Sequence, residues 1–475
     1  MLLQSCRAIV MRTPDCMHLP PIVVLAAWIP LGAYLFRRFP LRIAILANFL
    51  LGWGLLPGAN YVPSSSYFPY WILPVCVPSH DFITKSTIIG LSSIVGILLF
   101  HRRTFLSFRP RLIDAPAVLW CFAPLISSLA NHLSFWPGFC GFLYLSLAWL
   151  PPYFLGRFCF SSRDSLILVA KALVIAGILY VPICLLEFFT GPQLYAHIYG
   201  YQPYQWIGAH RYIGYRPVGF MEDGNQLGIW MATSALAATG LWVRGLASAV
   251  LRIPVQWAAV LLILMTLLCQ SVGSIVLLGL LLPLTFFNRR SALHIGAAAA
   301  LAAFILLAGL HFVHFGSLRS LARDNPLVHS IAVVLRSIGR DSLSWRIGRD
   351  ESQMSTICRA PVFGFGKWDW WRSGGVRPWD LWLLSFGMFG IPGVAALGCL
   401  FAAPVARVLW PSRWQEDPGQ LSLALLLIGV ILMSALDSLL NAAIILPYLL
   451  LVGALSSPVH ARYPSLSKGH AVHRI

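Results

Sequence analysis

A cluster of charged and amide side chains directly precedes one of the apolar segments of this chain. Arg211 and Arg216 are followed by Glu222, Asp223 and Asn225, where the apolar segment starts. That segment predicts a helix, whose first turn Asp223 or Asn225 can cap. A cap does not explain Arg216, because a cation near a helix N-terminus is unfavourable. An anion bound between Arg216 and the helix N-terminus would explain it, as a guanidinium binds phosphate through two parallel hydrogen bonds.

The longest connector between apolar segments, 313–380, is rich in arginine and tryptophan. It holds ten basic and six acidic residues, and this excess of positive charge indicates an anionic partner. Its candidate binding residues are Trp345, Arg346, Arg359, Arg372 and Arg377. The tryptophans fit equally well a belt at the membrane interface and stacking on sugar rings.

Asp380 closes this connector and stands at the start of the next apolar segment. Its position allows it to cap the following helix. It is also the carboxylate best placed to act as a general base, which takes a proton from a reacting group.

A short polar turn, Ser271 to Ser274, separates two apolar segments. It is either a tight turn or part of the lining of a polar pocket. Metal chemistry is not indicated: His311 and His314 share a helical face but lack a third ligand. The chain also has no DxD pair, no HExxH motif and no phosphate-binding Gly-Lys-Ser/Thr loop. We therefore expect neither a metal nor a cofactor.

The elements that position these residues are long apolar segments. The chain is 58% hydrophobic and only 11% charged, and segments of about 20 apolar residues cross a bilayer as helices. We predict an all-α polytopic membrane protein with about 12–13 transmembrane helices. The candidate spans are 20–36, 41–58, 86–101, 114–131, 138–156, 165–190, 224–243, 253–270, 272–287, 292–312, 381–406, 420–436 and 441–456.

The connectors between these spans alternate in charge. With the N-terminus outside, the inner connectors and the tail carry 18 basic residues, Arg157 among them; such a bias marks the cytoplasmic side. The net charge of +18 is thus read as a membrane signal, with no nucleic-acid partner. The predicted regions are a six-span bundle (1–190), an outer loop (191–223), central spans (224–312), a large outer loop between the tenth and eleventh spans (313–380), C-terminal spans (381–456) and a basic cytoplasmic tail (457–475).

Four short blocks together resemble the O-antigen ligase and O-antigen polymerase (Wzy-type) superfamily of bacterial envelopes. They are Arg216-x-x-Gly219 with Asn225, the turn at 271–274, the stretch from Trp345 to Pro361-Val-Phe-Gly-Phe-Gly366, and Gly390-Ile-Pro-Gly393. The resemblance implies a multi-pass glycosyltransferase of the bacterial inner membrane. Its donor would be a glycan on undecaprenyl diphosphate, its acceptor another glycan or a lipid-linked one, and a chain-length regulator would be a further candidate partner. Arg216, and less closely Arg346, match the arginines that hold the diphosphate.

One position departs from the ligase pattern. Ligases of this superfamily place a histidine eleven residues before the first glycine of the Gly-x-x-Gly turn, and here that position is Trp379, followed by Asp380. A polymerase of O-antigen or exopolysaccharide is therefore the first hypothesis, with Asp380 as the base. The alternatives are an O-antigen ligase acting on lipid A-core, a flippase for lipid-linked oligosaccharides, and a scaffold without activity.

Overall fold

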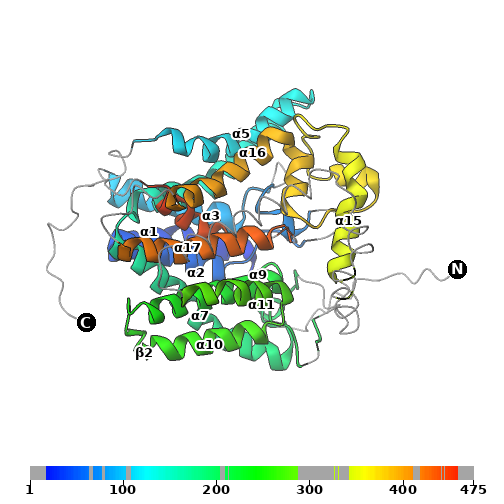
Figure 1. The fold of residues 1–475 in the computed structure, drawn as a ribbon. Coiled ribbons are helices and arrows are strands. Elements are labelled where there is room, and N and C mark those ends of the chain that lie inside the picture. Colours follow the sequence, from blue (N-terminus) through cyan, green and yellow to red (C-terminus); the bar gives the residue numbers. More distant parts are fainter. Residues whose placement is uncertain are drawn as a thin grey trace.

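The computed structural model describes residues 18–63, 68–76, 81–102, 109–203, 209–211, 213–286, 326, 330, 342–409, 418–439, 441–442 and 444–457. These residues fold mainly as helices, so the all-α prediction is confirmed for them. Most of the long helices run side by side in one bundle (Figure 1). The expected span 292–312, His311, His314 and nearly all of the 457–475 tail lie outside the described residues.

The α-helices are α1 (Pro21–Arg38), α2 (Leu41–Leu55), α3 (Lys85–Phe100), α5 (Ala115–Ala130), α6 (Phe135–Cys159), α7 (Arg163–Thr190), α8 (Leu194–Tyr199), α9 (Gly224–Val243), α10 (Val255–Leu268), α11 (Val272–Leu281), α15 (Ser342–Ile357), α16 (Leu381–Leu409), α17 (Pro418–Asp437) and α18 (Leu449–Ser456). Short 3-10 turns include η1 (Tyr70–Ile72), η2 (Leu112–Asp114), η3 (Pro283–Thr285), η4 (Trp370–Gly374) and η6 (Leu446–Tyr448). One small hairpin pairs β1 (Ala249–Val250) with β2 (Ile253–Pro254).

Six of the described helices are long and apolar enough to cross a membrane, which is consistent with a multi-pass membrane protein. They are Pro21–Arg38, Leu112–Ala130, Phe135–Cys159, Arg163–Thr190, Leu381–Leu409 and Gln420–Asp437. Five more apolar helices are shorter, at 10–17 residues. Most of the expected spans thus coincide with a helix, while their total number stays a prediction.

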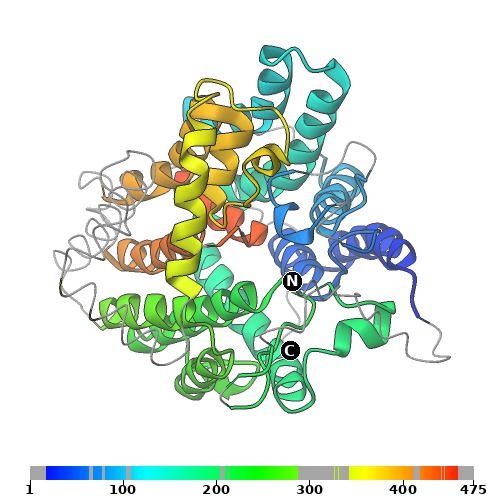
Figure 2. The ribbon, with the colours of Figure 1, turned by 90° about the vertical axis from the view of Figure 1, so that its right-hand side faces the viewer.

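Several helix ends that the charge pattern placed on one side meet at one end of the bundle. The Leu381 amide at the start of α16 donates to the Ser438 carbonyl just after α17 (3.1 Å). The Ser271 hydroxyl before α11 lies 3.3 Å from Asn225 in the first turn of α9. We call this end, where α9, α11 and α16 begin and α17 ends, the polar end. Helix α15 lies across it, as Figures 1 and 2 show.

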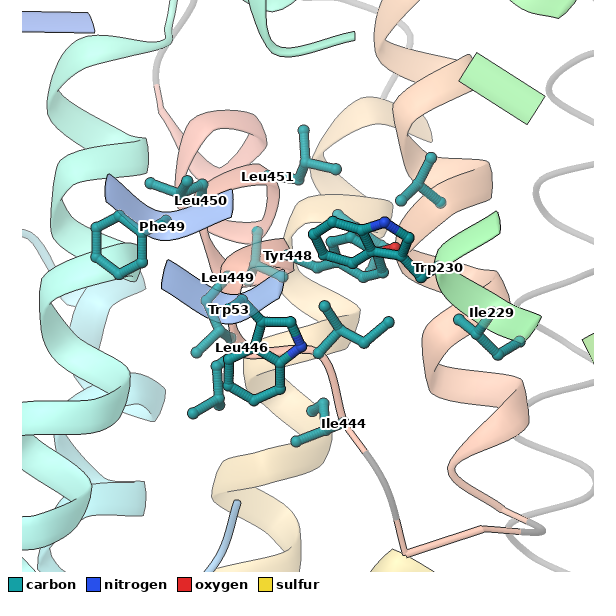
Figure 3. Packing of buried hydrophobic residues seen from close by; sticks show 14 of the residues in the cluster. Phe49, Trp53, Ile229, Trp230, Ile444, Leu446, Tyr448, Leu449, Leu450 and Leu451 are labelled. Atoms are coloured by element: carbon teal, nitrogen blue, oxygen red, sulfur yellow. The ribbon is translucent and has the colours of Figure 1, made fainter. Parts of the chain in front are cut away.

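The last apolar segment is not the continuous helix expected over 441–456. Its described residues are non-helical before η6, and all of α18 is buried within the protein. Figure 3 shows Tyr448 beside Trp230 of α9, and Leu446 and Leu449 close to Trp53 of α2. Non-helical backbone is tolerated at membrane depth where protein groups satisfy it; here the Gln226 amide donates to the Ile444 carbonyl (3.4 Å).

Helix α16 breaks near its middle, and the connector before it fills the break. Gly390 has φ 66° and ψ −163°, outside helical values. The amides of Phe365 and Gly366 donate to the carbonyls of Gly387 (2.8 Å) and Met388 (3.0 Å). The Ile391 amide in turn donates to the Pro361 carbonyl (3.0 Å). The hydrogen bond from Ile391 to Pro361 therefore joins two of the blocks that carry the family resemblance.

The opposite end of the bundle holds a buried ion pair between Arg157 and Asp114. Arg157 lies inside α6, with its Nε 2.7 Å from Asp114 Oδ1. It also donates to the Ser456 carbonyl at the end of α18 (3.1 Å). Arg157 was expected in the connector after a span ending at 156; instead α6 continues to Cys159 and buries this side chain against α18.

The repaired break generates a first prediction. In Gly390→Ala the new Cβ would lie 2.2 Å from the Val362 carbonyl oxygen, at a positive φ. Strained backbone of this kind costs on the order of 1–3 kcal/mol before any clash is counted. We expect a lower thermal midpoint and less monodisperse protein in detergent.

Gly398→Ala is the matched control on the same helix, since its Cβ would meet nothing nearer than 3.8 Å. Equal thermal midpoints for the two variants would contradict the role given to Gly390.

Candidate anion-binding site

The first turn of α9 separates the two candidate caps. Asp223 is the N-cap, and its Oδ1 accepts the Gln226 amide at 2.7 Å. Asn225 lies one position inside the helix and does not cap it. The capping prediction is therefore confirmed for Asp223 alone, and the Asn225 side chain is available for another partner.

That partner is Arg216. Its Nη2 donates to Asn225 Oδ1 at 2.6 Å, and the side chain is only 4% exposed. The guanidinium lies directly on Gly224, where a Cβ would come within 2.4 Å of Nε. Among the described residues, this Nε has no hydrogen-bond partner. A buried cation with a free donor thus stands at a helix N-terminus, as the anion hypothesis requires.

The Ser271 to Ser274 segment is the turn expected between two helices, and it also contacts the start of α9. It connects α10 to α11, and the Ser271 hydroxyl also reaches Asn225 Oδ1 at 3.3 Å. Ser274 donates to the Ser271 hydroxyl at 3.0 Å. Both serines approach α9 at Gly228, where a Cβ would lie 2.6 Å from each of them. Ser271 and Ser274 therefore lie beside the first turns of α9, next to Asn225.

Arg346 approaches the polar end from α15. Its Nη1 donates to Asn441 Oδ1 at 2.7 Å. The Asn441 amide donates in turn to Oδ1 of Asp437, which is the last residue of α17, at 2.8 Å. A Cβ added at Gly273, between Ser271 and Ser274, would lie 3.5 Å from the same carboxylate oxygen. Arg346 is therefore held near the residues that surround Asn225.

Asp437 and Asn441 were not predicted as site residues. They lie at the edges of two predicted apolar spans, and both interrupt an otherwise apolar stretch. Ionisable residues at such positions are a signal for a functional site, and this signal could have pointed to Asp437.

The charges of these groups interact. Burial lowers the pKa of Arg346, Arg216 lowers it further, and the carboxylates of Asp223 and Asp437 oppose that change. Arg346 stays charged, because an arginine pKa is far above neutral. Asp437 likewise interacts with both arginines. The arginines and aspartates of the site therefore form one electrostatic cluster.

Arg377 also interacts electrostatically with members of this cluster. Its guanidinium lies over the rings of Trp71 (3.1 Å to the centroid) and Trp379 (3.7 Å). Burial lowers its pKa well below the usual value, and Arg349 and Arg346 add to the effect while Asp223 opposes it. Tryptophans here hold an arginine in place, a use that neither tryptophan hypothesis anticipated.

Asp380 lies in a different environment. Its side chain is fully buried, Oδ1 accepts the Trp382 amide (2.8 Å), and Oδ2 accepts the Leu383 amide (3.3 Å). Both oxygens thus serve the N-terminus of α16. This geometry is that of a helix cap.

The other predicted residues lie outside the arginine cluster or are not placed in it. Glu222 pairs with Lys85 of α3 at 3.4 Å, and both are buried. Arg372 is exposed, stacks on Trp368 and lies 3.8 Å from Asp369. Arg359 is exposed just after α15, and Arg211 is half-buried with its backbone amide bonded to Gly214. Trp345 lies in α15, but its side chain is not among the described ones.

Within the described ranges, no group of three or more His, Cys, Asp or Glu side chains could hold a metal ion. No protein-family model and no curated protein matches this chain.

Proposed function

We propose that the chain is a glycosyltransferase of the bacterial inner membrane that uses a glycan carried on undecaprenyl diphosphate. The observation that carries this proposal is the pair Arg216 and Arg346. They come from separate regions of the chain, and each donates to an asparagine at the polar end of the apolar bundle. A diphosphate attached to a membrane lipid is an anion that would reach such a site from the bilayer.

The chemistry follows from the leaving group. An acceptor hydroxyl attacks the anomeric carbon of the donor sugar, the bond from that carbon to the diphosphate oxygen breaks, and undecaprenyl diphosphate departs. Negative charge grows on the diphosphate as the bond breaks. Guanidiniums fixed in a poorly solvated site stabilise that charge in the transition state more strongly than they would in water.

The acceptor hydroxyl needs a base. Since both oxygens of Asp380 accept helix amides, we propose that Asp380 is a cap and that Asp223 takes the proton. Asp223 is half-buried beside the arginines, and among the described residues its Oδ2 accepts the Asn225 amide at 3.3 Å. The acceptor that we favour is a second glycan repeat, which makes the protein a polymerase of O-antigen or exopolysaccharide.

The role of Arg216 gives the next prediction. In a strain lacking the gene, wild-type protein should restore the envelope polysaccharide, and Arg216→Lys should not, because an ammonium cannot fork onto two phosphate oxygens. We expect the Lys variant to retain less than about a tenth of the activity, the worth of one charge-assisted hydrogen bond.

Arg359→Lys changes an exposed arginine in the connector that precedes α16; it is the control and should restore polysaccharide fully. Gel analysis of the polysaccharide separates the activities: loss of a polymerase leaves single repeats, whereas loss of a ligase leaves lipid-linked polymer. Full restoration by Arg216→Lys, at normal expression, would remove Arg216 from the site.

The two capping aspartates provide a matched test of the base. Asparagine caps a helix nearly as well as aspartate but accepts no proton. We expect Asp223→Asn to be folded and inactive, and Asp380→Asn to be folded and active, in the same complementation assay. An inactive, stable Asp380→Asn together with an active Asp223→Asn would return the base to Asp380.

A further inference from the structure

Glu187, near the C-terminal end of α7, binds the segment of chain that leads into α9. Its Oε2 accepts the backbone amides of Val218 and Gly219, each at 2.7 Å. The carboxylate is only 1% exposed, and it also interacts with the Leu194 amide at the start of α8. Because hydrogen bonds to an ionised acceptor are strong, this carboxylate fixes the backbone two residues after Arg216.

Tyr180 lies about two turns earlier on the same helix and holds the next amide. Its hydroxyl accepts the Phe220 amide (3.1 Å) and donates to the Gly54 carbonyl of α2 (2.7 Å). Gly219 allows this close approach: at its φ of 60°, an added Cβ would lie 2.8 Å from the Tyr180 ring. Three consecutive amides of the segment are therefore paired with two side chains of α7.

A buried ion pair fixes the end of the same segment. Glu222 Oε1 lies 3.4 Å from Nζ of Lys85, the first residue of α3, and this ammonium lies 4.2 Å from the centre of the Trp53 ring. Both charged side chains are buried. A buried ion pair stabilises a fold no more than well-packed apolar side chains would. Stability alone therefore does not explain why three ionisable side chains, with Glu187, are buried around one short segment.

We propose that Glu187 is a positioning residue of the transferase site. It holds the segment 216–223 in one conformation, and so sets where the Arg216 guanidinium and the Asp223 carboxylate lie. Such groups act fully only when they are held within about 0.5 Å of the productive geometry. This role rests on the proposed function, which gives Arg216 and Asp223 their tasks. It adds a residue of α7 that acts through both of them, with Tyr180 as its partner on the same helix.

Hydrogen–deuterium exchange on purified full-length protein in detergent tests the hold on the segment. Glu187→Gln keeps the size of the side chain but places an NH2 donor where the carboxylate accepted. We expect the amides of 213–223 to exchange at least about tenfold faster than in wild type, because they open locally. The amides of α9 and α17 should exchange as before, and the thermal midpoint should stay within about 3 °C of wild type.

Thr190→Ala is the matched control, since Thr190 is exposed at the end of the same helix and its hydroxyl bonds within that helix. It should leave exchange and activity unchanged. In the complementation assay, Glu187→Gln at normal expression should retain less than about a tenth of the activity, since misplacement by about 1 Å can cost more than that. Tyr180→Phe removes one amide contact and should give smaller changes in both measurements.

Tyr180→Phe keeps the test decisive if Glu187→Gln does not fold. Unchanged exchange of 213–223 in both variants would overturn the proposal, as would faster exchange throughout the bundle, which would show general support of the fold. Faster exchange of 213–223 with full activity would overturn it as well. Normal polysaccharide in the deletion strain would refute the proposed function, and the exchange comparison alone would then show whether Glu187 holds the segment.

Discussion

Burying a cation where water is scarce costs several kcal/mol unless neighbouring groups compensate, and the polar end of this bundle is arranged around that constraint. The ends of α9, α11 and α17 supply serine, asparagine and aspartate side chains to two arginines that come from outside the helical core. Helix α15 carries Arg346 across the end of the bundle (Figure 2). The indole rings of Trp71 and Trp379 enclose Arg377. The helix ends, the crossing helix and the tryptophans therefore hold several arginines in fixed positions.

A second constraint fixes where α15 can lie. The connector that follows α15 forms backbone hydrogen bonds with the break in α16. Two side chains at the end of α5 bond to these two segments. Ser127 donates to the Met388 carbonyl (2.9 Å), and Asn131 donates to the Gly364 carbonyl (2.8 Å). The Trp379 amide donates to Asp350 of α15 (2.6 Å). Because buried backbone groups must be paired, these contacts anchor both ends of the segment between α15 and α16. Arg346 is thus positioned by a framework that begins at the break in α16.

Features that depend on local pattern could be predicted from the sequence. The prediction for α7 differs from the helix by two residues at its start, and α9 coincides with the predicted segment 224–243. Bilayer thickness sets the length of a long apolar helix such as α7, so hydropathy reveals it. The partners of the arginines could not be found in this way, because Asn441 lies far along the chain from Arg346 and only the fold brings them together. Asp380 shows the same limit: its position allowed a cap and a base and was predicted to give the base, whereas its two side-chain oxygens accept amides of α16 as a cap does.

The proposed function requires a phosphorylated lipid to lie between Arg216 and Arg346. A cryo-electron microscopy structure of the full chain in a lipid nanodisc with undecaprenyl diphosphate would test this directly. We predict density for the two phosphates at the polar end, one within hydrogen-bond distance of each guanidinium, with Asn225 and Asn441 still bound to them. Phosphate density elsewhere on the protein, with Arg216 and Arg346 unchanged and uncontacted, would contradict the central claim.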